Sequence, residues 1–294
     1  MRRLLLILLT VTLLLTGCAS QQRAPVGPTL ACTTYPVYLL AQTVTEGTDG
    51  PIPVLVVDQP LSCLHSYTLT MADMKVIDAS ALLALNGAGM EEFLEDVLEG
   101  RDTVDCSEGL ELLWNEEEAE PDSHIWLDPD NAAQMAQNLA AALAERYPDN
   151  ADLYRSNAEQ AAQRLHTLRE ELREELASLP CRSLITFHDG FSYFANAVGM
   201  DIAASVEEEE GSEASARRIQ ELVDLIDEKH IPAVFTETNG PDATAKALAM
   251  ERPIQVGTLN MLMSSTGVPE GLSGLDAYEW GMRTNAEAIK EAYQ

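Results

Sequence analysis

The sequence predicts an α/β fold of two lobes, each with a parallel β-sheet flanked by helices, joined by one long backbone helix. Two observations predict it. Short β-rich runs alternate with helical patterns on both sides of residues 149–179, which is typical of parallel sheets. That central stretch lies between Pro148 and Pro180 and contains neither glycine nor proline. We therefore expect an N-terminal lobe at 29–148, a linking helix at 149–179 and a C-terminal lobe at 180–294.

The linking helix is predicted from its apolar periodicity. Its apolar residues recur at spacings of three and four, which places them on one face of a helix: Ala161, Leu165, Leu168, Leu172, Leu176 and Leu179. At 1.5 Å per residue the helix would be about 45 Å long. The pattern alone is also compatible with an ordinary surface helix. The histidines that precede and follow it favour the linking role.

The elements of the N-terminal lobe follow from local patterns. We expect strands at 30–34, 53–57, 81–85 and 103–105, and helices from Pro36, Thr70, Met90 and Pro129. The run 53–57 is fully apolar, which predicts a strand buried on both faces. Thr70 is expected to cap its helix with Asp73 at the third helical position. Asp128 is expected to cap the helix that begins at Pro129.

The same alternation restarts after the linking helix. We expect strands at 183–187, 201–206, 233–235 and 254–259, with helices at 190–197, 241–250 and 277–293. A further helix through Ile226 is capped by Ser212 or Ser215.

Charge restricts the partners of the folded body. The chain of 294 residues has a formal net charge of −30, with 18 Lys and Arg against 48 Asp and Glu. Nucleic acid and anionic lipid headgroups carry the same sign, so we expect neither to bind this surface.

The first residues predict export and lipid attachment. Arg2 and Arg3 precede an apolar run at 4–15, which has the length of a signal peptide and is short for a membrane-spanning helix. The stretch Leu15-Thr16-Gly17-Cys18 resembles the bacterial lipoprotein processing box. This resemblance implies a signal peptide at 1–17, a lipidated Cys18, and a tether at 18–28 that holds the protein outside the cytoplasm on the membrane.

The remaining cysteines allow two disulfides. Cys32, Cys63, Cys106 and Cys181 form an even set in an exported chain, and four cysteines have three connectivities. We prefer Cys63–Cys106, because both residues follow predicted strands of the same lobe. Cys63 also lies two residues before His65, so a thiolate ligand is the alternative.

Polar side chains gather after the predicted strands, where open parallel sheets bind ligands. His188, Glu237 and Asn260 follow strands of the C-terminal lobe. His65 lies in the loop after 53–57, and His124 precedes Ile125-Trp126-Leu127. All five could converge on one cleft between the lobes.

Three neutral imidazoles with an open or oxygen-filled fourth position favour Zn²⁺, whereas Mn²⁺ and Ca²⁺ prefer more carboxylates. The two other histidines have structural explanations. His166 lies off the apolar stripe of the linking helix, and His230 follows a helix end, where positive charge is favourable. The sequence contains neither an HExxH motif nor a glycine-rich phosphate loop.

Four stretches now resemble a known family, the metal-binding lipoproteins of bacterial ABC importers for zinc and manganese. They are 64–67, 122–129, 187–194 and the strand end Phe235-Thr236-Glu237. The resemblance implies that His65, His124 and His188 bind the metal, and histidine at the third place resembles the zinc members. It further implies a non-enzymatic monomer that delivers Zn²⁺ to a membrane permease.

The fourth ligand differs from the family pattern. The family often has an aspartate where this chain has Asn260, so Asn260, Glu237 or water is expected there. With three neutral ligands, Glu237 would offset the metal charge.

Three other interpretations remain at this point. The same fold could bind Mn²⁺ or Fe²⁺. Three histidines with an open position also suit an exported zinc hydrolase, with Glu237 as general base. An adhesin with a structural metal is the third.

Overall fold

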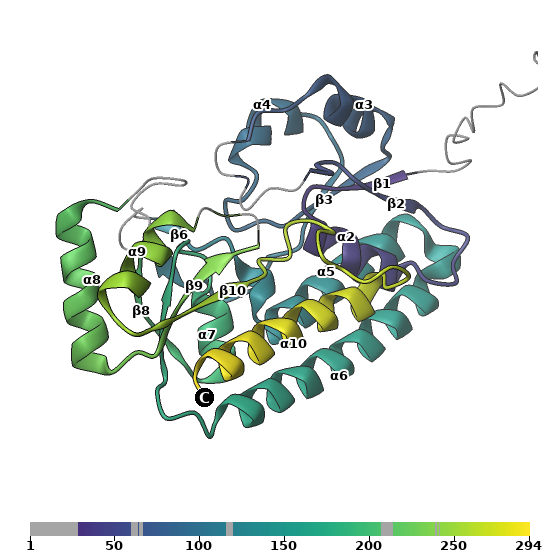
Figure 1. Cartoon of the computed structure of the whole chain (residues 1–294). Helices are drawn as coiled ribbons and strands as arrows, with labels where there is room; N and C mark the ends of the chain where they lie inside the picture. Colours follow the sequence, from purple (N-terminus) through teal and green to yellow (C-terminus); the bar gives the residue numbers. More distant parts are fainter. Residues whose placement is uncertain are drawn as a thin grey trace, which may run out of the picture.

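The computed structural model describes residues 29–59, 64, 67–115, 120–206, 214–238, 240 and 242–294. Within this part of the chain, two four-stranded parallel sheets form separate lobes, and a long helix connects them (Figure 1). The predicted fold class is confirmed. Cys18, Cys63 and His65 lie outside the described residues.

The N-terminal lobe has the strand order β2-β1-β3-β4. Its strands are β1 (Thr29–Cys32), β2 (Ile52–Leu55), β3 (Leu82–Leu85) and β4 (Thr103–Asp105). Its helices are α2 (Tyr35–Val44), α3 (Met71–Ala79), α4 (Glu95–Leu98) and α5 (Pro129–Arg146), with 3₁₀ turns η1 (Glu92–Leu94), η2 (Ile125–Leu127) and η3 (Pro148–Asn150).

The C-terminal lobe has the strand order β10-β9-β7-β8. When its strands are numbered by their order within the lobe and read from the β8 edge, this is the same order as in the N-terminal lobe. Its strands are β7 (Ser183–Thr186), β8 (Asp201–Ser205), β9 (Ala233–Glu237) and β10 (Gln255–Leu259). Its helices are α7 (Ser192–Val198), α8 (Ala216–Lys229), α9 (Ala243–Glu251) and α10 (Gly274–Ala292). Because the orders match, the carboxyl ends of β1, β3, β7 and β9 lie at the centre of their sheets.

The predicted caps are present. The Thr70 hydroxyl accepts the Asp73 N–H at 3.3 Å, and the Asp73 carboxylate accepts the Thr70 N–H at 2.7 Å. Asp128 accepts the Asp130 N–H at 2.8 Å at the start of α5. Ser215 caps α8, and Ser212 lies outside the described residues. Local sequence therefore set these helix starts.

The prediction for 53–57 is wrong in one respect. β2 lies at the edge of its sheet, and its residues 53–55 are half-buried rather than buried, whereas Val56 and Val57 after the strand are buried. An apolar run gives a strand but does not give its place in the sheet, since that depends on distant pairings. A second difference is the short antiparallel pair of β5 (Trp114–Asn115) and β6 (Glu120–Pro121), which are not among the expected strands.

The linking helix is α6 (Ala151–Leu176), 26 residues long and so about 39 Å in length. Its buried face contains Ala161, Leu165, Leu168, Leu172 and Leu176, as the periodicity predicts. Leu179 lies beyond the helix end and is half-buried. The buried stripe packs α6 against α5, α2, α7 and α10.

One hydrophobic core runs from the N-terminal sheet through α5, α6 and α10 into the C-terminal lobe. A second, smaller core lies beneath α8 and α9. Helix α10 belongs to the C-terminal sequence but also packs against α2, and the Gly274 N–H donates to the Gln42 side chain at 3.0 Å. Figure 1 shows α10 and α6 running side by side. The lobes are thus joined by packed helices and not by flexible strands.

No helix in the described residues has the length and hydropathy to cross a membrane. Cys32, Cys106 and Cys181 form no disulfide with one another, and the Cys63–Cys106 pairing stays a prediction.

Candidate metal centre

His124 lies in the loop between β6 and η2 and is only 3% exposed. Asp122 determines which nitrogen of the ring carries the proton. The Asp122 carboxylate lies 2.8 Å from Nδ1 of His124 and also accepts the His124 backbone N–H at 2.9 Å. With Nδ1–H donating to Asp122, the lone pair is on Nε2, as in carboxylate–histidine pairs at metal sites.

His188 meets His124 from the other lobe. It follows β7 after Phe187, and its Nε2 lies 3.1 Å from Nε2 of His124. The two rings are nearly perpendicular, at 81°, with centroids 5.0 Å apart. Two nitrogens bound to one tetrahedral Zn²⁺ at the usual bond length would be about 3.4 Å apart. The pair therefore fits the spacing of two ligands of one metal ion.

Gly190 leaves the room that this pair needs. A Cβ atom there would lie 2.6 Å from Met261 Cε, 2.7 Å from His188 Cδ2 and 3.0 Å from His124 Cδ2. Any side chain at position 190 would press on both rings, so glycine is required by close approach rather than by its backbone angles.

A second carboxylate lies behind His188. Glu237, the last residue of β9, is buried, and its Oε1 lies 4.0 Å from Nδ1 of His188. Each histidine thus has a carboxylate on its Nδ1 side, Asp122 for one and Glu237 for the other.

Asn260 is tied into the C-terminal lobe. Its side-chain oxygen accepts the Leu262 N–H at 2.7 Å, its N–H donates to Asn285 at 2.7 Å, and its carbonyl accepts from Asn285 at 2.8 Å. These bonds connect the end of β10 to α10 and give the amide a local structural role.

The loop that carries His124 is held by the opposite lobe. The Trp126 indole N–H donates to the Met261 carbonyl at 2.8 Å, and the Tyr278 hydroxyl of α10 donates to the Trp126 carbonyl at 2.6 Å. Trp126 and Phe191 are fully buried, so both are core residues. Inter-lobe hydrogen bonds thus fix the position of His124 relative to His188.

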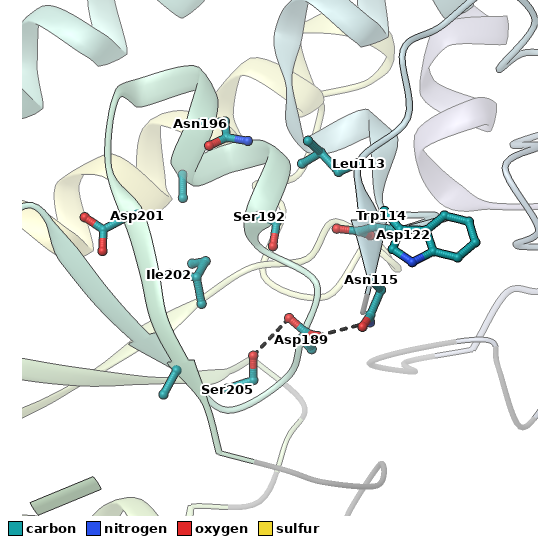
Figure 2. A pocket seen from close by; sticks show the side chains of 12 residues that line it. Leu113, Trp114, Asn115, Asp122, Asp189, Ser192, Asn196, Asp201, Ile202 and Ser205 are labelled. Atoms are coloured by element: carbon teal, nitrogen blue, oxygen red, sulfur yellow. Dashed lines mark hydrogen bonds between the residues drawn. The ribbon is translucent and has the colours of Figure 1, made fainter. Parts of the chain in front are cut away.

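A polar pocket of about 430 Å³ adjoins the centre, between β5 and the C-terminal lobe. Figure 2 shows Asp189 in this pocket between Ser205 and Asn115. The Asp189 carboxylate accepts hydrogen bonds from the Ser205 hydroxyl at 2.9 Å and from the Asn115 side-chain amide at 3.1 Å. Asp122 also lines this pocket and contacts Nδ1 of His124, so it connects the pocket to the histidine pair.

The other predicted site residues fall into two groups. His65 lies outside the described residues, and within the described ranges no group of three His, Cys, Asp or Glu side chains is arranged to hold a metal. His166 is exposed and lies 2.6 Å from Asp130, and His230 ends α8 with a φ of 53°. His166 thus lies off the buried stripe of the linking helix and His230 at a helix end, as predicted for each.

Sequence reasoning missed Asp122 and Gly190. Asp122 could have been found from its place two residues before His124, because a carboxylate commonly orients a metal-binding histidine. Gly190 gave no such signal, since only the folded arrangement brings Met261 and both rings around it.

Comparison with known proteins identifies the family. The family model described as zinc-uptake complex component A, periplasmic (ZnuA), matches residues 30–292. The chain belongs to the ZnuA family. This confirms the family resemblance of the four sequence stretches.

The names of relatives in the ZnuA family refer to different metals. The manganese-binding lipoprotein MntA of Halalkalibacterium halodurans is 31% identical over 179 residues, covering 59% of this chain and 60% of the relative. The zinc-binding lipoprotein AdcA of Streptococcus pneumoniae is 25% identical, covering 99% of this chain and 61% of the relative. The chain therefore spans about three fifths of the length of these relatives.

The fold is shared with solved structures. The laminin-binding protein Lmb of Streptococcus agalactiae superposes with a TM-score of 0.80 at 23% identity, over 91% of this chain and 100% of that one. The ZnuA family and these relatives are solute-binding proteins rather than enzymes. This agrees with the prediction that the chain has no catalytic activity and leaves the hydrolase interpretation without support.

Proposed function

We propose that this protein binds Zn²⁺ between its two lobes, outside the cytoplasm, and delivers it to the permease of an ABC importer. The observation that carries the proposal is the His124–His188 pair, whose Nε2 atoms lie 3.1 Å apart from opposite lobes. Membership of the ZnuA family supports the transport role.

His65, His124 and His188 are the proposed ligands. Nitrogen ligands favour Zn²⁺ over Mn²⁺ and Ca²⁺, which take oxygen. Glu237 lies on the Nδ1 side of His188, so we assign it to offset the charge of the metal and to orient that ring. Asn260 is already bonded to Leu262, which leaves water as the proposed fourth ligand.

A metal competition tests the binding site. The chain from Ala19 to Gln294, which contains every described residue, is stripped of metal and titrated with Zn²⁺ and Mn²⁺ against a chromophoric chelator. We expect one tight zinc per chain and its loss in His188→Ala. His166→Ala removes an exposed histidine and should bind as the unchanged protein does. Binding untouched by His188→Ala would overturn the proposed site.

The same titration decides the metal. The relatives named above include both a zinc-binding and a manganese-binding lipoprotein. Stronger binding of Mn²⁺ than of Zn²⁺, or of Fe²⁺ when it is titrated in the same way without oxygen, would replace the proposed cargo while leaving the site in place.

We also propose that Cys18 anchors the protein to the membrane by acyl chains. Cells that express Cys18→Ala should release the protein into the soluble fraction, whereas the unchanged chain should sediment with membranes. Equal fractionation of both proteins would contradict lipid anchoring.

A further inference from the structure

Residues 86–94, which we call the 86–94 segment, leave the carboxyl end of β3 and include η1. The segment turns sharply, because Gly87, Ala88 and Gly89 all have positive φ, at 82°, 53° and 87°. The alanine at such an angle is unusual, so the turn is fixed by its surroundings rather than by local preference.

Glu91 fixes this turn from inside. Its Oε1 accepts the Thr33 hydroxyl and the Asn86 N–H, both at 2.6 Å, and its Oε2 accepts the Gly87 N–H at 3.0 Å. Thr33 follows β1 and Asn86 follows β3, so one buried carboxylate ties the ends of two neighbouring strands together.

Asn86 connects this turn to the loop that carries His124. The side chain is completely buried, and its Nδ2 donates to the carbonyls of Gly87 and Ser123, both at 3.0 Å. Ser123 directly precedes His124 in the chain. The loop before the imidazole is therefore held at the Ser123 carbonyl by Asn86, in addition to the bonds from Asp122.

The same segment also contacts Tyr67. Phe93 meets Tyr67 edge-on, with ring centroids 5.6 Å apart. The Tyr67 hydroxyl donates to Asp73 at 2.7 Å, and its N–H donates to the Leu64 carbonyl at 3.0 Å. Leu64 and Tyr67 flank His65 in the sequence.

We propose that Asn86 is a positioning residue of the metal centre and that, through it, the 86–94 segment aligns the loop that carries His124. The inference rests on the proposed function. Its physical reason is that metal affinity depends on ligands being held in place before the metal binds. Through its hydrogen bond to the Ser123 carbonyl, Asn86 reaches the backbone of the His124 loop from the end of β3.

The test compares two asparagines of the same lobe. Asn86→Ala removes the donor to Ser123. Asn138→Ala is the matched control, because Asn138 Nδ2 likewise donates to two backbone carbonyls, of Cys106 at 2.9 Å and Glu108 at 2.8 Å. Zn²⁺ competition, the visible spectrum of bound Co²⁺ and the Tm of the metal-free protein are measured for both variants and for the unchanged chain.

We expect both variants to lower Tm but only Asn86→Ala to weaken Zn²⁺ binding, by about tenfold or more. Its Co²⁺ spectrum should also change, which a purely structural role would not produce. If Asn86→Ala does not fold, the same measurements are made on Asn86→Ser. The serine side chain is too short to reach the Ser123 carbonyl, and it removes less side-chain volume than alanine does.

The outcomes separate the two proposals. Tight binding by the unchanged chain with equal affinity in Asn86→Ala and Asn138→Ala would overturn this inference and leave the proposed function intact. Equal weakening in both variants would also overturn it, because the effect would then follow stability. No metal binding by the unchanged chain would overturn both.

Discussion

The Asp122 carboxylate accepts two hydrogen bonds from His124, one from Nδ1 at 2.8 Å and one from the backbone N–H at 2.9 Å. Both the orientation of the ring and its tautomer therefore depend on one buried side chain. The Nε2 atom of His124 thereby points toward Nε2 of His188, 3.1 Å away.

Replacing Asp122 with asparagine should weaken zinc binding by about 10- to 100-fold, because an amide is a poorer acceptor and does not enforce the tautomer. Chelator competition measures the loss. Asp227→Asn, which removes a surface carboxylate paired with Arg252, is the control and should leave affinity unchanged. Equal affinity in Asp122→Asn would show that the ring is oriented by packing alone.

Gly190→Ala should disturb the metal centre more than the fold. The new methyl group would lie 2.6 Å from the flexible end of Met261, which can move, and 2.7 Å from the His188 ring. We expect zinc affinity to fall while Tm changes by a few degrees. Thermal melts and zinc titration on the same sample distinguish these effects, and unchanged affinity would contradict the prediction.

Trp126→Phe should lower the free energy of unfolding by about 1 kcal/mol or somewhat more, since it removes the hydrogen bond to Met261 and leaves that carbonyl without its donor. Urea unfolding of the metal-free protein measures the change. Trp114→Phe is the control, because Trp114 is 61% exposed and its loss should have little effect. Equal stability of the two variants would mean that the inter-lobe bond contributes nothing.

Stability should depend on pH through Glu91. Burial outweighs its three hydrogen bonds and raises the pKa of this carboxyl from 4.5 to about 7. Between these values the unfolded chain releases the proton and the folded chain keeps it. The contribution of Glu91 is thus fully present below about pH 4.5 and is lost as pH rises through about 7, by an amount on the order of 3 kcal/mol.

Glu91→Gln removes this titration and provides the measurement. The stability of the unchanged chain relative to the variant, measured by urea unfolding without metal, should decrease from pH 5 to pH 8. A difference that stays constant across this range would show that Glu91 ionises at its usual pKa.

Much of the fold could be predicted because its signals are local. The Thr70 capping box, the Asp128 cap and the apolar stripe of α6 depend on residues three or four positions apart, and all three are present. The edge position of β2 could not be predicted, because an apolar strand has the same sequence pattern in the centre and at the edge of a sheet.

The sequence by itself determined the two α/β lobes, the helix between them, and the placement of His188 and Glu237 at strand ends, since helical and strand periodicity record which face each element buries. Only the tertiary structure decided that His124 and His188, which are 64 positions apart, face each other, that Glu237 lies behind one ring and Asp122 behind the other, and that Gly190 leaves them room. These relationships arise from packing between lobes, where residues distant in sequence meet and no local pattern records the contact.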